Sequence, residues 1–398
     1  LNAGSSSIKY QLFEMPENHT LLAGSVAKIG EESSTITHNI FTANGSTKTN
    51  KISAVIPDHM ESLRRIVSLL LDAEWGVIEN ANEIVAVGHR VVHGGEKFSK
   101  PIIVTTDVLE ELRKLSYLAP LHNPANIKGI EVAADIFTQA IQVAVFDTAF
   151  HQTMPDYAFR YAIPERFYKD EGLRAYGFHG TSHQFVSKEA ARFLSIEPAQ
   201  FNAISIHLGN GCSITAIKGG KSVDTSMGLT PLGGLIMGTR SGDIDPSLIL
   251  FLAKHLNMPN DEIDHLLNKE SGLKGLAGNN DLRDVIERYH KQDSAAVLAI
   301  GMYVYRIKKY IGAYAATLGH IDALLFTAGV GENSAFIREK VCQGLDILGI
   351  SLDADLNDAG ATGVRSIEAS TSQVRVLVVP TNEELEIAIQ TLPFAEQR

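Results

Sequence analysis

Apolar runs of strand length alternate with helix-like patterns along the whole chain, and this alternation constrains the fold more than any other feature. The strand-like runs lie at residues 84–87, 141–146, 203–207, 324–326 and 374–379. Helical periodicity lies at residues 59–71, 106–115, 126–134, 183–193, 294–318 and 334–345. A Thr-, Ser- and Ile-rich segment at residues 35–56 predicts a β-hairpin or meander. The chain is therefore expected to be an α/β protein, with ligand loops after its strands.

Length and composition exclude several classes of protein. The 398 residues predict about two or three domains, and 44% hydrophobic residues are typical of a folded chain. A net charge of −11 argues against nucleic acid or an anionic membrane as a partner. Two cysteines cannot form a disulfide framework, which favours the cytoplasm. The chain starts at Leu1 without Met, so we expect a few leading residues to be missing.

Two polar glycine-containing loops about half a chain apart resemble each other. Residues 2–9 read Asn-Ala-Gly-Ser-Ser-Ser-Ile-Lys, and residues 208–215 read Leu-Gly-Asn-Gly-Cys-Ser-Ile-Thr. Each leads into an alternating run that predicts an antiparallel strand. Echoes this short also arise by chance, but we favour a duplicated fold whose halves each present a phosphate loop.

Three loops have the composition that phosphate binding needs, because glycine lets backbone amides approach an anion and Ser or Asn adds donors. They are residues 2–7, 209–213 and 326–333. Each alone fits a structural turn equally well, but three together favour a nucleotide. Neither standard nucleotide motif is complete, since Thr215 replaces the first glycine of a P-loop and Ser334 the third of a dinucleotide fingerprint.

Charged groups lie beside these glycines. Arg90 and Arg240 stand in glycine-framed segments, where a guanidinium can bind carboxylate or phosphate, although surface ion pairs are the commoner role. Asp147 follows an apolar run and fits a turn, a Mg²⁺ ligand or a positioning group. His179 and His183 have the spacing of zinc ligands but lack the accompanying Glu, so a phosphoryl donor fits His179 better.

Further polar residues have both structural and functional interpretations. His207 precedes a glycine loop and could donate to phosphate, whereas His183 could equally be a hydrogen-bonded core residue. Glu383 lies at the start of a terminal helix, where a carboxylate is favourable in any case, or it could bind Mg²⁺.

Eight motifs together resemble the acetate kinases and their close relatives, the propionate kinases. They span the chain: residues 2–9, 88–96 (Gly-His-Arg-Val-Val-His-Gly-Gly-Glu), 146–151 (Phe-Asp-Thr-Ala-Phe-His), 176–183 (Tyr-Gly-Phe-His-Gly-Thr-Ser-His), 207–211 (His-Leu-Gly-Asn-Gly), 237–243 (Met-Gly-Thr-Arg-Ser-Gly-Asp), 327–333 (Thr-Ala-Gly-Val-Gly-Glu-Asn) and 381–385 (Thr-Asn-Glu-Glu-Leu).

The resemblance implies a two-domain α/β fold shared by acetate and sugar kinases, Hsp70 and actin, with a duplicated ribonuclease-H-like core and a central ligand cleft. The N-terminal domain would comprise residues 1–148 and 383–398. Residues 149–382 would form the nucleotide-binding and dimerisation domain. The family's substrates are ATP and a short carboxylate, used with Mg²⁺ or Mn²⁺, and its members form homodimers.

The same resemblance assigns roles residue by residue. The catalytic residues would be Asp147, Arg90, His179 and Arg240. The ligands of Mg²⁺ would be Asn2 and Glu383. The acyl group would meet Arg90, Val92, Leu121, Phe178 and Pro231, of which the last four could also be plain core residues. The nucleotide would contact Lys9, His207, Leu208, Gly209, Asn210, Gly211, Asp281, Leu282, Arg283, Gly329, Val330, Gly331, Glu332 and Asn333.

These residues predict an acetate kinase that transfers phosphoryl directly from ATP. Val92 is branched where propionate-preferring relatives carry a smaller residue, which favours acetate. A propionate kinase, a non-catalytic ATP-binding switch on the same fold and a phosphatase of the same superfamily are the alternatives.

Overall fold

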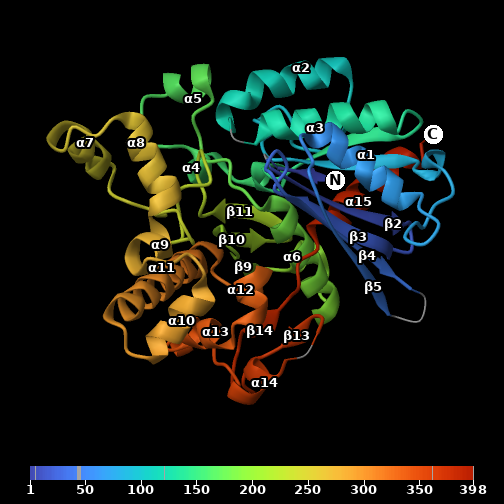
Figure 1. Cartoon of the computed structure of the whole chain (residues 1–398). Coiled ribbons are helices and arrows are strands. Elements are labelled where there is room, and N and C mark those ends of the chain that lie inside the picture. Colours follow the sequence, from blue (N-terminus) through green and yellow to red (C-terminus); the bar gives the residue numbers. More distant parts are fainter. Residues whose placement is uncertain (5, 43–45, 121, 361, 398) are drawn as a thin grey trace. The chain divides into compact units, whose positions relative to one another are not determined.

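The computed structural model describes the chain except residues 5, 43–45, 121, 361 and 398 (Figure 1). It divides into two compact units, the first comprising Leu1–Ala149 with Asn382–Arg398 and the second comprising Phe150–Thr381. Each unit combines sheets and helices, as the alternating sequence pattern predicts.

The first unit contains an antiparallel sheet and a smaller mixed sheet. The antiparallel sheet has the order β1-β2-β3-β4-β5 and the mixed one the order β6-β8-β7. Their strands are β1 (Asn2–Ala3), β2 (Ser7–Glu14), β3 (His19–Ala27), β4 (Ser34–Phe41), β5 (Thr47–Ala54), β6 (Ala86–Val91), β7 (Ile102–Ile103) and β8 (Ile141–Phe146). The antiparallel pair β4–β5 confirms the hairpin predicted for residues 35–56, whose Asn44-Gly45 lies outside the described residues.

Leu1 joins the two sheets of the first unit. Its amino group donates to the Gly88 carbonyl at 2.7 Å, and its carbonyl accepts from the Arg90 amide at 2.9 Å. This is a parallel bridge, so the strand order continues from β3-β2-β1 through Leu1 into β6-β8-β7.

The second unit contains one six-stranded sheet with the order β11-β10-β9-β12-β14-β13. Strands β9 and β12, and strands β12 and β14, pair in parallel, whereas the outer pairings are antiparallel. The strands are β9 (Ala203–Leu208), β10 (Cys212–Lys218), β11 (Lys221–Thr225), β12 (Ala323–Thr327), β13 (Arg365–Ser366) and β14 (Arg375–Val378).

The two units repeat one topology. The series β3-β2-β1-β6-β8-β7 matches β11-β10-β9-β12-β14-β13 strand for strand, with the same parallel and antiparallel pairs. In each unit the short antiparallel edge strand precedes its partner in the sequence. The two glycine loops that resemble each other join β1 to β2 and β9 to β10. The topology thus confirms the predicted duplication.

Helices cover the sheets of each unit. The first unit has α1 (His59–Leu70), α2 (Thr106–Lys114), α3 (Asn123–Ile136) and α15 (Glu383–Ala395). The second has α4 (Asp156–Phe159), α5 (Arg166–Glu171), α6 (Gly180–Leu194), α7 (Pro246–His255), α8 (Asn260–His265), α9 (Gly272–Ala277), α10 (Leu282–His290), α11 (Ser294–Leu318), α12 (Ala328–Asn333), α13 (Ala335–Cys342) and α14 (Ala354–Asp358). Within these described residues, the structure contains no helix long and apolar enough to cross a bilayer.

Local sequence explains where the helices begin and end. Asp293 caps α11 by accepting from the amides of Ala295 and Ala296, and Gly319 ends the helix with a positive φ. The C-terminal helix α15 packs on β6, where a Cβ at Gly88 would lie only 2.6 Å from Ile387 Cγ2. Glycine at this position therefore allows the end of the chain to pack on the first unit.

The bounds of one predicted strand and the conformation of one predicted loop were wrong. The strand predicted at residues 84–87 runs instead from Ala86 to Val91, because it pairs residue by residue with β8 while Val85 is exposed. The glycine segment after β12 is not an open loop, since Ala328–Asn333 form the short helix α12 and Ser334 caps α13.

Candidate active site

Arg90 and Asp147 meet in the first unit at the ends of two parallel strands. Strands β6 and β8 pair in register, so Arg90 near the end of one strand lies beside the residue that follows the other. Arg90 Nη2 donates to Asp147 Oδ2, and Arg90 Nη1 donates to Asn2 Oδ1 at 3.3 Å. The Asp147 side chain is 1% exposed, so the ion pair is shielded from water on the carboxylate side.

The cluster around Arg90 also includes two carboxyl groups, those of Asp147 and Glu383. Burial opposes the charged form of Arg90, but Asp147 and Glu383 outweigh it and raise the pKa of Arg90 above its usual value. Burial raises the pKa of Glu383 to about 7, with Arg90 opposing that shift and Asp147 adding to it. The buried Nε–H of Arg90 has no hydrogen-bond partner among the described residues. An anionic ligand would supply the acceptor that this N–H lacks.

Oxygen donors suited to Mg²⁺ belong to the same cluster. Asn2, Asp147 and Glu383 offer an amide oxygen and two carboxylates, and Mg²⁺ in proteins is often held by one or two carboxylates with water and substrate phosphate. Burial is the main cause of the raised pKa of Glu383 and Asp147 adds to it, and a bound cation would favour the charged carboxylate. The described residues contain no cluster of three or more His, Cys, Asp or Glu side chains placed to hold a metal.

The predicted acyl-pocket residues divide between the units. Val92 is buried in the first unit, where its amide donates to Asn126 Oδ1 at 3.0 Å. Phe178 is buried in the second unit, and the Pro231 carbonyl there accepts from Arg240 Nη1 at 2.9 Å. The fourth predicted residue, Leu121, lies outside the described residues.

Three predicted residues of the second unit surround one point. A Cβ built on Gly211 would lie 3.4 Å from His179 Nε2 and 3.5 Å from Arg240 Nη1. His179 precedes α6 with a left-handed φ of 55°, which directs the chain into the helix. Burial lowers the pKa of Arg240, which makes no ion pair with a described carboxylate. A desolvated guanidinium, an imidazole and a glycine loop together can hold an anionic oxygen.

A network of hydroxyl and imidazole groups lies behind this point. The rings of His179 and His207 stack with centroids 4.2 Å apart, and Ser182 Oγ lies 2.9 Å from His207 Nδ1. Ser213 Oγ lies 2.9 Å from His179 Nδ1. Ser213 ends the loop 209–213 predicted to bind phosphate, whereas no role was predicted for Ser182 from the sequence. The sequence of β10 alternates Ser213 and Thr215 with apolar residues. Because the strand is buried apart from its last residue, these two hydroxyls need hydrogen-bond partners inside the protein.

A cavity of about 700 Å³ adjoins the glycine loop of the second unit, a volume in the range of small-molecule sites. Asp281 caps α10, and the exposed Arg283 donates back to it at 2.6 Å. Eight of the predicted nucleotide residues line the cavity: Gly209, Asn210, Asp281, Leu282, Arg283, Gly329, Val330 and Asn333.

The other predicted nucleotide residues lie elsewhere. Lys9 belongs to the first unit, opposite Asn2 in the β1–β2 pair. Leu208 is buried in the core, and Gly331 packs against the backbone of Phe326. Glu332 accepts from the Thr381 amide at 3.1 Å and lines a separate cavity. His207 and Gly211 belong to the group around His179 rather than to the cavity wall.

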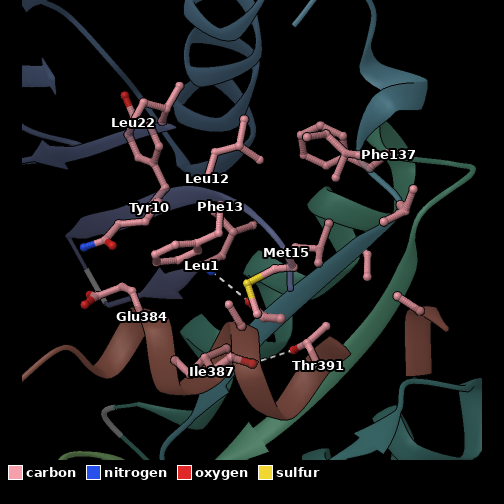
Figure 2. Close-up of a pocket in the computed structure, with 18 of the residues that line it drawn as sticks. Leu1, Tyr10, Leu12, Phe13, Met15, Leu22, Phe137, Glu384, Ile387 and Thr391 are labelled. Atoms are coloured by element: carbon pink, nitrogen blue, oxygen red, sulfur yellow. Dashed lines mark hydrogen bonds between the residues drawn. The ribbon is translucent and has the colours of Figure 1, made fainter. Parts of the chain in front are cut away.

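An apolar cavity of about 380 Å³ in the first unit contains none of the predicted site residues. Figure 2 shows Leu12 and Phe13 of β2 and Ile387 of α15 around it, with Leu1 nearby. It extends along β2 from Tyr10 to Glu14 and includes Met15 just beyond the end of that strand. Its lining is mostly apolar and contains no lysine, arginine or histidine to bind phosphate, so the candidate site does not lie there.

The comparisons with known proteins agree with one another and extend over the full length of this chain. The acetokinase family model matches residues 1–389. The chain is 51% identical to an acetate kinase of Helicobacter pylori, covering 100% of this chain and 98% of the relative. It is also 51% identical to an acetate kinase of Streptomyces coelicolor, covering 100% and 96%.

Solved structures agree. A Porphyromonas gingivalis acetate kinase has a TM-score of 0.91 at 44% identity, covering 99% of this chain and 98% of that one. A propionate kinase of Francisella tularensis has a TM-score of 0.90 at 42% identity, with the same coverage. These likenesses and the repeated strand order confirm the predicted α/β fold of the acetate kinases with its duplicated core.

Proposed function

Because the chain belongs to the acetokinase family, we propose that it transfers the γ-phosphoryl group of ATP reversibly to acetate, giving acetyl phosphate and ADP. It is a phosphotransferase with a carboxyl group as acceptor. The observation that carries the proposal is the meeting of His179, Arg240 and Gly211 at one point, within 3.5 Å of a Cβ built on that glycine. A phosphoryl group placed there would find a cation, an imidazole donor and a loop that leaves it room.

We propose that Arg90 binds the carboxylate of acetate. Its guanidinium has a buried N–H that finds no partner in the described part of the chain, and it is held in place by Asp147. Val92, Phe178, Pro231 and Leu121 are proposed as the walls that limit acyl length. Since a propionate kinase matches the chain almost as well as an acetate kinase in TM-score, propionate is the second candidate substrate.

The nucleotide is assigned to the cavity of the second unit. Its edge is formed by the loop after β9, the start of α10 and helix α12. Asp281 and Arg283 lie on one side of it and the backbone of Gly329 and Val330 on another. His207 would add a donor on the phosphate side, stacked on His179.

The reaction brings two anions together, so cations matter more than a base. A carboxylate is already nucleophilic, and we therefore propose direct in-line transfer without a phosphoenzyme. Arg90 would orient the carboxylate, Arg240 and His179 would stabilise charge on the transferring group, and Asp147 would position Arg90. Asn2 and Glu383 would hold Mg²⁺ or Mn²⁺, which when bound neutralises charge on the phosphate oxygens.

A paired assay tests this function. The purified protein is mixed with ATP and either acetate or propionate, with and without Mg²⁺, and acyl phosphate is trapped with hydroxylamine. We expect product with both acids, more with acetate, and none without a divalent ion. Nucleotide binding without trapped product would favour a non-catalytic switch, and acceptor-independent phosphate release a phosphatase.

The Arg240→Ala variant tests the site itself. We expect kcat to fall by about two orders of magnitude or more, since an oriented cation is lost from the transition state. Nucleotide affinity by calorimetry and the thermal midpoint should stay near wild type. Normal turnover would remove Arg240 from the mechanism.

We propose a homodimer formed through the second unit. Helix α7 has no buried residue, and its Leu248, Leu250 and Phe251 are exposed. Helix α11 exposes Leu298 and Tyr305. We propose that these exposed apolar side chains on α7 and α11 contribute to the interface. A cytoplasmic location is proposed because both cysteines are buried and neither forms a disulfide, which is typical of proteins in a reducing compartment.

A further inference from the structure

A chain of three buried side chains leads from the sheet of the second unit to His179. Ser205 Oγ lies 2.8 Å from His183 Nδ1, and His183 Nε2 lies 2.8 Å from Ser213 Oγ. Ser213 Oγ in turn lies 2.9 Å from His179 Nδ1. Ser205, His183 and Ser213 are all fully buried, so their contacts with one another are shielded from bulk water.

Hydrogen-bond chemistry links the protons along this chain. The pKa of His183 is lowered well below its ordinary value, chiefly by burial, so the ring is neutral and carries one N–H. Ser213 has one hydroxyl hydrogen and an imidazole nitrogen on each side. It can donate to only one of them, and the other ring must then donate to Ser213. The hydrogen bonds of the chain therefore all donate in the same direction, either from Ser205 toward His179 or from His179 toward Ser205.

Ser205 decides between the two directions. If the protons point away from His179, His183 donates to Ser205, and the Ser205 hydroxyl needs another acceptor. No other partner of that hydroxyl exists among the described residues. If the protons point toward His179, Ser205 donates to His183, His183 to Ser213, and Ser213 to His179 Nδ1. The hydroxyls of Ser205 and Ser213 and the N–H of His183 are then all satisfied, which favours this direction because a buried unpaired donor is costly.

We propose that Ser205, His183 and Ser213 form a relay of positioning residues that fixes neutral His179 as the tautomer with its proton on Nε2. That nitrogen lies 3.4 Å from the Cβ position of Gly211, beside Arg240. The relay thus supplies an N–H donor at the point where the proposed function places the phosphoryl group. With the opposite tautomer, Nε2 would present a lone pair to an anionic oxygen and repel it.

The tautomer can be measured without turnover. Protein labelled with ¹⁵N-histidine is examined by two-bond ¹H–¹⁵N correlation at a pH where His179 is neutral, and His179 is assigned by its loss in His179→Gln. We expect a protonated Nε2 and an unprotonated Nδ1. A protonated Nδ1 in the wild-type protein would overturn the relay whatever the variants do.

Variants test the positioning role. Ser213→Ala should shift the His179 pattern toward Nδ1–H or a mixture and lower kcat at least about tenfold, less than the ~10²–10³-fold loss when a donor is removed outright. Ser213→Thr keeps the hydroxyl and should restore the wild-type His179 pattern and the wild-type kcat. The matched control is Ser222→Ala, which removes a similar 2.8 Å contact to His151 outside the relay and should change neither.

The outcomes separate this inference from the proposed function, on which only its kinetic part rests. An unchanged imidazole pattern or an unchanged kcat in Ser213→Ala would overturn the relay's role. If the wild-type protein makes no acyl phosphate, the proposed function fails, while a protonated Nε2 still supports the relay as a structural device.

Discussion

The guanidinium of Arg90 lies directly against the carboxylate of Asp147, at the ends of two parallel strands that pair in register. The carboxylate is 1% exposed and the guanidinium 20%. Such a pair contributes less by attraction than by orientation, because desolvation offsets much of the Coulomb energy. We therefore see Asp147 as a group that positions Arg90 rather than as a base.

Breaking this pair should affect both stability and turnover. Asp147→Asn leaves the guanidinium without its counter-charge, and we expect a loss of about 3 kcal/mol in the free energy of unfolding. Urea denaturation and the hydroxylamine assay measure the two effects. The control is Glu131→Gln, which breaks the exposed 2.6 Å pair with Arg113 and should change little. An equal loss in both variants would contradict the assignment.

Acyl specificity should depend on Val92. Val92→Ala removes two methyl groups from the proposed wall and should move the ratio of kcat/KM toward propionate by about tenfold, the scale of a methylene in an apolar pocket. Val91→Ala is the matched control, since Val91 is fully buried in the core with Phe146. It should lose comparable stability without moving the ratio. A similar shift in both variants would place the pocket elsewhere.

Gly211 should be essential for turnover because its lack of a side chain leaves space for the phosphoryl group. Its Cβ position is in van der Waals contact with His179 and Arg240, so Gly211→Ala puts a methyl group where the phosphoryl oxygen is proposed to lie. We expect kcat to fall at least about a hundredfold. The thermal midpoint should barely move. Gly312→Ala, on an exposed part of α11 with open space around it, should leave kcat unchanged.

Asp224 should make stability depend on pH. Burial raises its pKa from 3.8 to about 6, although it accepts a hydrogen bond from the Thr225 amide. Between these two values the unfolded chain ionises while the folded protein stays protonated, so the free energy of unfolding falls as pH rises. Asp224→Asn should therefore be more stable than wild type by about 1–3 kcal/mol at pH 7. At pH 3.5 the two proteins should match in urea denaturation, and a difference independent of pH would refute the shift.

The dimer proposal predicts a dissociating variant. Phe251→Glu or Leu298→Glu puts a charge on the apolar surface of α7 or α11 and should shift sedimentation equilibrium toward the monomer. Ile347→Glu, at a residue 92% exposed on another element, should leave the association state unchanged. A wild-type protein that sediments as a monomer would end the proposal.

Local sequence determined more of the fold than of the site. Apolar runs fixed β8 and β9 within one residue, because a fully buried strand reads as an unbroken apolar run. Helix α11 was predicted with its observed bounds, from periodicity that starts after Asp293 and stops at Gly319. The glycine-rich motifs likewise predicted which segments flank the cavity, since backbone that approaches an anion closely needs glycine.

Tertiary structure decided which of these residues act together. Strand β6 extends past its apolar run to Val91 because pairing with β8, not local propensity, sets its length. The same pairing brings Arg90 to Asp147, 57 residues away in sequence. Ser205 and Ser213 read as ordinary strand residues, and only the packing of α6 on β9 shows that they enclose His183. Sequence patterns report burial and backbone freedom, whereas contacts between distant side chains arise only when the sheet is assembled.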